Sequence, residues 1–222
     1  MQMPEDMKEE AACCSPYNFE RDVITPSLET VIEKAVRVLS RDGLVVYPTE
    51  TIYGLGADAL SEIAVYKVYE AKQRPMGKPI SVAVSDLEMV DAIAYVDDFA
   101  ERFLQKFLPG PVTVVLPVKR CLPSDLSGGT GTIGIRYPDH AVAQAVIAAL
   151  DSPITATSAN ISGEISPVTA DQVNVPHDYL IDGGKLPGTP STVVNLATGK
   201  IERPGALLEE IATFLKEERA EL

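Results

Sequence analysis

The chain has 222 residues, enough for one large domain or two small ones, and its 45% hydrophobic and 23% charged residues are ordinary for a globular protein. Its formal net charge of −13 disfavours non-specific binding to the phosphodiester backbone of nucleic acids. No run approaches the roughly 18 consecutive apolar residues of a membrane span. Residues 1–10 are acidic and lack the apolar core of a secretory signal, so we expect a cytoplasmic protein without membrane contact.

Cysteine and histidine are scarce. The adjacent Cys13 and Cys14 are poorly placed to bridge each other, and no Cys-x-x-Cys occurs. Neither a disulfide framework nor a Cys/His metal site is predicted. Of the two histidines, His140 follows Pro-Asp at a predicted helix start, which is typical of a solvated or capping role. A Ser-His-Asp mechanism has almost no residues to draw on.

The first half of the chain alternates helices and strands. We expect residues 1–20 to form a flexible arm with scattered charge and no periodicity, and residues 21–222 to form one domain. Ser27 is a candidate N-cap for a helix with apolar positions at helical spacing. Helices are predicted over 28–39 and 61–72, and strands over 44–46 and 80–84, with a loop over 47–56.

The second half continues the alternation. Asp97 or Asp98 is expected to cap a helix that Pro109-Gly110-Pro111 ends. Further helices are predicted over 140–150 and 206–216, and strands over 112–118, 133–136, 154–157, 180–181, 192–196 and 200–203. Interleaved elements with some short links predict an α/β fold, in which a twisted, mixed parallel and antiparallel sheet is flanked by helices.

Two loops in the first half combine polar side chains with bases or glycines, as ligand-binding loops of α/β sheets do. Residues 48–56 hold two threonines and two glycines, although they also suit a simple turn after a strand. Residues 72–78 place three bases within seven positions, and Lys72 and Arg74 could approach one phosphate chain from two sides. Alternatively, these bases complement a helix C-terminus.

Two further loops follow later strands. The glycine-rich stretch 128–136 lacks the spacing of a Walker loop or a dinucleotide fingerprint. Arg136, which ends it, needs an anionic partner that is either a protein carboxylate or a substrate carboxylate. Ser158 and Asn160 lie two apart after a strand and could point into one cavity, or could cap a local turn.

Seven strings occur in an order that resembles one family, the YrdC/Sua5 threonylcarbamoyl-AMP synthases, over roughly residues 25–215. They are Tyr47-Pro-Thr-Glu-Thr-Ile-Tyr-Gly-Leu-Gly56, Lys72-x-Arg74-Pro75, Leu108-Pro-Gly-Pro-Val-Thr113, Gly134-Ile-Arg136-x-Pro138, Ser158-Ala-Asn-Ile-Ser-Gly163, Ser191-Thr-Val-Val194 and Arg203-Pro-Gly205. The resemblance implies the family's mixed α/β fold in its single-domain, YrdC-like form. It also implies that ATP, L-threonine and bicarbonate give threonylcarbamoyl-AMP and pyrophosphate, the first step toward t6A on tRNA.

The resemblance also implies roles for particular residues. The motif Lys-x-Arg…Ser-x-Asn implies a catalytic set of Lys72, Arg74, Ser158 and Asn160, in which Lys72 and Arg74 would hold the triphosphate with Ser158 and Asn160 beside them. ATP contacts are implied for Lys72, Arg74, Lys78, Thr132, Ser158, Ser166 and Arg203, and threonine contacts for Thr51, Arg136 and Ser191. We expect Mg²⁺ to be carried on the phosphates, since no clustered acidic ligands are visible and no protein metal site is predicted.

Two positions depart from the family pattern: Lys78 stands where several members have Asn, and Ala156 stands where some have a threonine-binding hydroxyl. The partner implied for the product is a tRNA threonylcarbamoyl transferase complex, with direct tRNA binding weak or absent. Two other functions stay open at this point. One is a related carbamoyl-adenylate-forming enzyme, and the other is a non-catalytic RNA-binding module of the same fold.

Overall fold

The computed structural model describes residues 27–220, so the predicted arm over 1–20 and the first residues of the predicted domain lie outside the described residues. The strands form two mixed sheets. The four-stranded sheet has the order β7-β2-β1-β8, with β1 Val45–Tyr47, β2 Gly54–Gly56, β7 Thr157–Ser158 and β8 Tyr179–Leu180. The six-stranded sheet has the order β10-β9-β4-β5-β3-β6, with β3 Val82–Ala83, β4 Val112–Pro117, β5 Thr132–Arg136, β6 Ile154–Thr155, β9 Thr192–Asn195 and β10 Lys200–Arg203.

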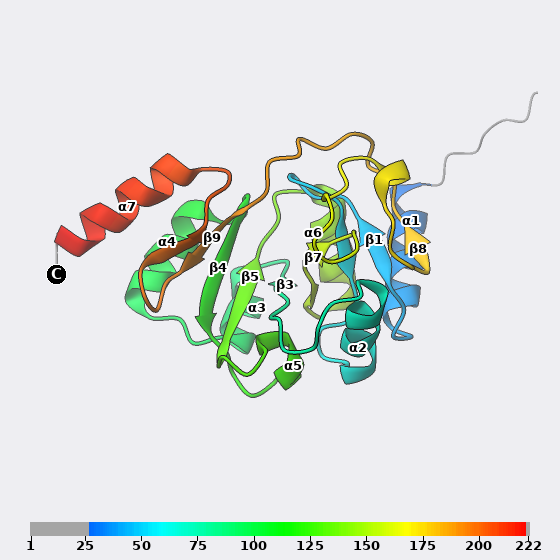
Figure 1. Cartoon of the computed structure of the whole chain (residues 1–222), viewed down its shortest axis with the longest axis horizontal. Helices are drawn as coiled ribbons and strands as arrows, with labels where there is room; N and C mark the ends of the chain where they lie inside the picture. The colour runs from blue at the N-terminus through cyan, green and yellow to red at the C-terminus, as the bar shows by residue number, and fades with distance from the viewer. Residues whose placement is uncertain (1–26, 221–222) are drawn as a thin grey trace, which may run out of the picture.

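Helices cover both sheets (Figure 1). They are α1 Leu28–Leu39, α2 Glu62–Ala71, α3 Leu87–Ile93, α4 Asp98–Phe107, α5 Ser124–Ser127, α6 Ala141–Leu150 and α7 Leu208–Ala220, with a 3₁₀ turn at Ala170–Gln172. Polar side chains start four of them, because Ser27, Ser61, Asp86 and Asp97 each accept a hydrogen bond from a first-turn backbone N–H. None of the helices within residues 27–220 is long and apolar enough to cross a membrane.

The core consists of two clusters of buried side chains, and each cluster contains residues from both sheets. Beside the four-stranded sheet, α1 packs on α6 and buries Ala35 and Leu39 together with Ile147. At the other end of the molecule, α4 and α7 meet through aromatic rings, with the Phe103 and Phe214 centroids 5.5 Å apart. Such edge-on aromatic pairs add stability beyond the area they bury.

Most predicted elements are confirmed, including the Ser27-capped helix, the Asp97-capped helix and the mixed pairing of the strands. The prediction of one sheet was wrong, because the predicted strand 154–157 divides at Ala156. Its first half, β6, pairs with β3, whereas its second half, β7, pairs with β2 in the other sheet. The chain therefore crosses between the sheets at a single residue, Ala156, whose N–H donates to the Ser81 carbonyl at 2.7 Å.

Helices α3 and α5 and strand β2 were not predicted. Strand β2 lies inside the segment predicted as a loop, because its glycines suggested a turn. Gly54 pairs with Tyr47 across the ladder, and a Cβ on Gly54 would come within 2.8 Å of the Tyr47 ring. The glycine thus makes room for a buried aromatic side chain, which sequence periodicity does not reveal.

The crossing point depends on Thr155, which is fully buried. Its hydroxyl donates to the Leu55 carbonyl at 2.9 Å and accepts from the Ala57 N–H at 3.0 Å. These two bonds link the end of β2 to β6. The same residue's carbonyl accepts the Tyr47 hydroxyl proton at 3.2 Å. One side chain therefore satisfies backbone groups from a neighbouring segment at the junction of the sheets.

We expect Thr155→Val to lower the free energy of unfolding by about 2 to 4 kcal/mol, because it strands a buried carbonyl and a buried N–H. Urea denaturation followed by circular dichroism measures the change. Thr155→Ser is the matched control, since it keeps the hydroxyl and loses one methyl group, at about 1 kcal/mol. Equal losses in the two variants would show that the hydroxyl does not hold the junction.

Candidate active site

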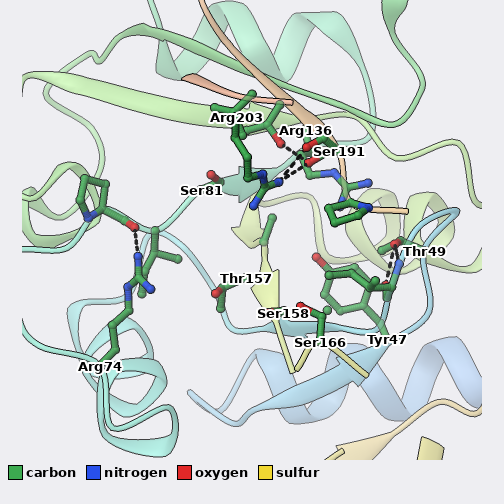
Figure 2. A pocket seen from close by; sticks show the side chains of 18 residues that line it. Tyr47, Thr49, Arg74, Ser81, Arg136, Thr157, Ser158, Ser166, Ser191 and Arg203 are labelled. Carbon is green, nitrogen blue, oxygen red and sulfur yellow. Dashed lines mark hydrogen bonds between the residues drawn. The ribbon is translucent and has the colours of Figure 1, made fainter. Parts of the chain in front are cut away.

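One cavity of about 330 Å³ lies where the two sheets meet (Figure 2). Both sheets contribute to its wall, as do the loop before β3 and the end of the segment that links β8 to β9. Its lining consists of Tyr47, Thr49, Ile52, Gly54, Arg74, Pro79, Ile80, Ser81, Thr113, Arg136, Ala156, Thr157, Ser158, Ser166, Pro190, Ser191, Val193 and Arg203. The chain crossing at Ala156 thus forms part of the cavity wall.

The lining is positively charged in a protein whose net charge is −13. Within residues 27–220 it holds three arginines, Arg74, Arg136 and Arg203, and neither aspartate nor glutamate. Hydroxyl groups of serine and threonine occupy much of the remaining surface. Guanidinium groups bind phosphate and carboxylate with two parallel hydrogen bonds, so the cavity is suited to a small anionic ligand.

Arg136 ends β5 and is 9% exposed. Its Nη2 lies 2.5 Å from Oε1 of Glu50 and 3.1 Å from Oγ1 of Thr51. Both alternatives considered for Arg136 are thus compatible with its position, because it has a protein carboxylate as partner and still lines the cavity. Thr51 is 1% exposed and lies behind Arg136 rather than in the lining.

Arg203 reaches the cavity from β10. Its Nη2 donates to the Ser191 carbonyl at 2.8 Å and to Oγ of Ser191 at 3.0 Å, and that hydroxyl contacts Oγ1 of Thr113 at 2.8 Å. Partial burial, and secondly the positive charge of Arg136, lower the pKa of Arg203 from its ordinary value. Two cationic side chains therefore converge on one wall, and Figure 2 shows Arg136, Ser191 and Arg203 gathered there.

Arg74 lies on the far side of the cavity from this group (Figure 2). It follows the C-terminus of α2, where Gln73 adopts a left-handed backbone conformation with φ 48°. The guanidinium donates to the carbonyls of Lys78 and Pro79, at 3.3 and 2.8 Å. These bonds fold the loop 74–79 back on itself and hold Arg74 at the cavity edge.

Lys72 lies beside the cavity and is 1% exposed. Its ammonium donates to the backbone carbonyls of Ser158 and Asn160, the latter at 2.7 Å, while the Lys72 carbonyl accepts from the Ser162 N–H at 2.9 Å. Burial, and secondly the positive charge of Arg74, lower the pKa of Lys72 to about 8. In this arrangement Lys72 ties the end of α2 to the loop that carries Ser158.

Asn160 also serves this loop. It is 3% exposed, and its side-chain amide donates to the carbonyls of Ile161 and Glu164, at 2.8 and 2.9 Å. Its Oδ1 is buried without a hydrogen-bond partner in the described chain. Ser158 and Ser166, in contrast, line the cavity (Figure 2). The pair Ser158 and Asn160 therefore combines one cavity-facing residue with one that shapes the backbone.

The other predicted residues are more peripheral. Lys78 is exposed, and Oγ1 of Thr132 contacts Oγ1 of Thr130 at 3.0 Å; neither belongs to the lining. His140 occupies the N-cap position of α6 without a side-chain capping bond, so a capping role for its side chain was wrong. Burial lowers its pKa, an effect that Glu50 and Asp139 oppose. The structure thus brings six of the predicted residues into the lining: Arg74, Arg136, Ser158, Ser166, Ser191 and Arg203.

Several lining residues were not singled out from the sequence. Tyr47 and Thr49 belong to a quoted motif, which could have suggested them, and burial raises the pKa of the Tyr47 hydroxyl. Thr113 likewise ends a quoted motif, whereas Ser81 belongs to none. Thr113 meets Ser191 only because β4 and β9 pair in parallel, with Val112 opposite Thr192. Ala156 lines the cavity as well, and its N–H is already used by Ser81.

Comparison with known proteins defines the class. The family model described as "Telomere recombination", which covers Sua5, YciO and YrdC proteins, matches residues 37–205, and the chain belongs to this family. It is 39% identical over 206 residues to the threonylcarbamoyl-AMP synthase of Pyrococcus abyssi, covering 86% of this chain and 60% of that protein. It is 38% identical over 190 residues to the Bacillus subtilis synthase, covering 81% and 54%.

A solved structure gives the same result. The crystal structure of Pyrococcus abyssi Sua5 complexed with L-threonine aligns with a TM-score of 0.79 and 39% identity. The alignment covers 82% of this chain and 56% of that one, so the chain spans little more than half the length of this relative. The mixed α/β fold implied by the sequence motifs is confirmed.

The buried ammonium of Lys72 makes stability depend on pH. Its pKa of about 8 in the folded protein lies below the value of about 10.4 for an unfolded lysine, so between them the unfolded chain binds more protons. We expect the free energy of unfolding of the wild type to rise, relative to Lys72→Met, from about pH 8 to about pH 10. Urea denaturation of both proteins across this range measures the difference.

The exposed Lys78→Met variant is the control for losing one positive charge anywhere on the surface. A wild-type to Lys72→Met difference that stays constant over this range would contradict the expectation. It would mean that the two carbonyl acceptors hold the ammonium in its charged form despite burial.

Proposed function

We propose that this protein is an L-threonylcarbamoyladenylate synthase, a nucleotidyltransferase that converts ATP, L-threonine and bicarbonate into threonylcarbamoyl-AMP and pyrophosphate. The observation that carries the proposal is the hydroxyl-rich cavity with three arginines and, within residues 27–220, no acidic lining residue. Membership of the family supports it, as do the synthase names of the two relatives and the threonine complex of the Pyrococcus abyssi protein.

The chemistry requires charge stabilisation and positioning. The amine of threonine and bicarbonate give a carbamate and water, and a carbamate oxygen then attacks the α-phosphorus of ATP. The bond from that phosphorus to the β-phosphate oxygen breaks, and pyrophosphate leaves with the electron pair. No protein nucleophile takes part, so fixed cationic and hydrogen-bonding groups provide the main catalytic effect.

The cavity suggests a division of labour between its two sides. We assign the triphosphate to the side of Arg74, with the hydroxyls of Ser158 and Ser166, and the substrate carboxylate to Arg136 and Ser191. Arg203 stands near Arg136 and could serve the nucleotide from there. Lys72 and Asn160 would act through the backbone of the 158–163 loop, and Thr51 through Arg136.

ATP would bring Mg²⁺ with it. Within residues 27–220, no group of three His, Cys, Asp or Glu side chains is placed to hold a metal ion. Serine and threonine hydroxyls in the lining could still complete the coordination of an ion carried by the phosphates. The ion would neutralise phosphate charge, and the arginines would orient the triphosphate. Thr132 and Lys78 would reach a nucleotide only at the periphery.

We place the reaction in the cytoplasm, at the first step toward t6A on tRNA. A tRNA threonylcarbamoyl transferase complex would receive the product. Direct tRNA binding is expected to be weak or absent, because the net charge of −13 opposes contact with a polyanion.

Pyrophosphate release, measured with ATP and with threonine or bicarbonate omitted in turn, tests the function. We expect release only when all substrates are present. Pyrophosphate release that does not depend on threonine but requires a carbamoyl donor would favour a related carbamoyl-adenylate-forming enzyme. Salt-sensitive RNA binding with no turnover would favour an RNA-binding module instead.

Arg74→Ala tests the proposed triphosphate side. We expect turnover to fall by about tenfold or more with little change in melting temperature, because a half-buried loop arginine supports charge rather than the core. Arg41→Ala, which removes an exposed arginine outside the cavity, is the matched control. Near-normal turnover of Arg74→Ala would mean that Arg74 merely complements the end of α2.

A further inference from the structure

Glu50 does not line the cavity, yet it contacts a residue that does. Its Oε1 lies 2.5 Å from Nη2 of Arg136, and the two side chains are only 14% and 11% exposed. Ion pairs sheltered from water are weakly screened, and removal of one partner leaves the other charge uncompensated. The Glu50 carboxylate therefore restrains the Arg136 guanidinium at the cavity.

A second anchor reaches the same nitrogen through two threonines. Oγ1 of Thr49 lies 2.7 Å from the Ile52 carbonyl, which can only accept, so the single hydroxyl proton of Thr49 is used there. The contact of 2.9 Å between the hydroxyls of Thr51 and Thr49 must then be donated by Thr51. Thr51 in turn accepts from Nη2 of Arg136 at 3.1 Å.

Proton counting thus gives one direction to the whole chain, from Arg136 to Thr51 to Thr49 to the Ile52 carbonyl. Two backbone N–H groups, of Thr51 and Ile52, also point to Oγ1 of Thr49 at 3.2 Å and fix that hydroxyl in place. Both protons of Arg136 Nη2 are consumed, one by Glu50 and one by Thr51. Nε of Arg136 is buried without a hydrogen-bond partner in the described chain, so Nη1 remains as the group that could meet a ligand from the cavity.

Charge gives a reason for this support. Arg203 stands close enough for the charge of Arg136 to lower its pKa, and its own anchors on Ser191 are neutral. Two like charges on one wall repel each other unless a negative charge offsets them. Glu50 places that charge behind Arg136, outside the lining, where it does not face an anionic ligand.

We propose that Glu50 is a positioning residue for Arg136, and that Thr49 completes the support through Thr51. Its effect is to hold the guanidinium ready for the carboxylate of the amino-acid substrate, which rests on the function proposed above. A pre-oriented group loses less freedom when the ligand arrives, so the benefit appears in substrate affinity.

Steady-state kinetics of pyrophosphate release test this. We expect Glu50→Gln to raise the KM for threonine about fivefold or more while the KM for ATP changes by less than about twofold. Glu33→Gln, on the exposed face of α1, is the control for losing one negative charge. A fall in melting temperature with both KM values rising together would overturn the proposal, because it would indicate a general structural defect.

The hydrogen bonds of Thr49 and Thr51 provide a second test if Glu50→Gln folds poorly. Thr49→Val preserves the shape of the side chain but removes the hydroxyl, so we expect the KM for threonine to rise about twofold to fivefold. Thr49→Ser keeps the hydroxyl and should stay near the wild type. If the KM for threonine of Thr49→Val also stays near the wild-type value, the hydrogen bonds through Thr51 and Thr49 do not position Arg136.

A measurement without substrate separates this proposal from the proposed function. Selective ¹⁵N spectra of arginine side chains report rotation about the Nε–Cζ bond. We expect separate, slowly averaging Nη signals for Arg136 in the wild type and averaged signals in Glu50→Gln. Averaged signals in both proteins would overturn the positioning role. Absence of threonine-dependent turnover in the wild type would instead refute the proposed function.

Discussion

Repulsion between like charges is the constraint on which this site depends. Arg74, Arg136 and Arg203 surround one cavity, and within residues 27–220 its lining contains no carboxylate. Each guanidinium is held from behind, by backbone carbonyls for Arg74, by a carboxylate and a hydroxyl for Arg136, and by Ser191 for Arg203. The supporting groups occupy some N–H donors of each arginine, so an anion meets groups that are already oriented.

The meeting of the two sheets brings Arg136 and Arg203 to the same cavity as Ser158. Arg136 and Arg203 belong to the six-stranded sheet, whereas Ser158 belongs to the four-stranded one. The chain passes from one sheet to the other at Ala156, and Thr155 secures that passage with buried hydrogen bonds. The long segment between β8 and β9 makes a second connection across the molecule, where the Gly188 N–H bonds the Thr51 carbonyl (Figure 1). The cavity is thus a consequence of how the sheets join.

Lys72 shows why a motif does not by itself assign a contact. Its family motif suggested a phosphate ligand, and its position places the ammonium on two carbonyls of the 158–163 loop. A buried ammonium needs acceptors, and the backbone carbonyls of Ser158 and Asn160 supply two of them. Under the proposed function, Lys72 would act on nucleotide binding through the backbone that carries Ser158. Glu50 is the opposite case, because no motif assigned it a role, yet it forms an ion pair with Arg136, which was a predicted site residue.

Local rules predicted α1, α2, α4, α6 and α7 from the sequence alone, since caps and apolar stripes need only neighbours three or four residues away, whereas α3 and α5 were missed. The ordered motifs likewise determined the family and most of the polar residues now found around the cavity. Only the tertiary structure decided that the strand through Ala156 serves two sheets, that Gly54 makes room for Tyr47, and that Glu50 lies behind Arg136. Each of these depends on a partner far away in the sequence or on the other face of a strand, and such pairings leave no periodic trace.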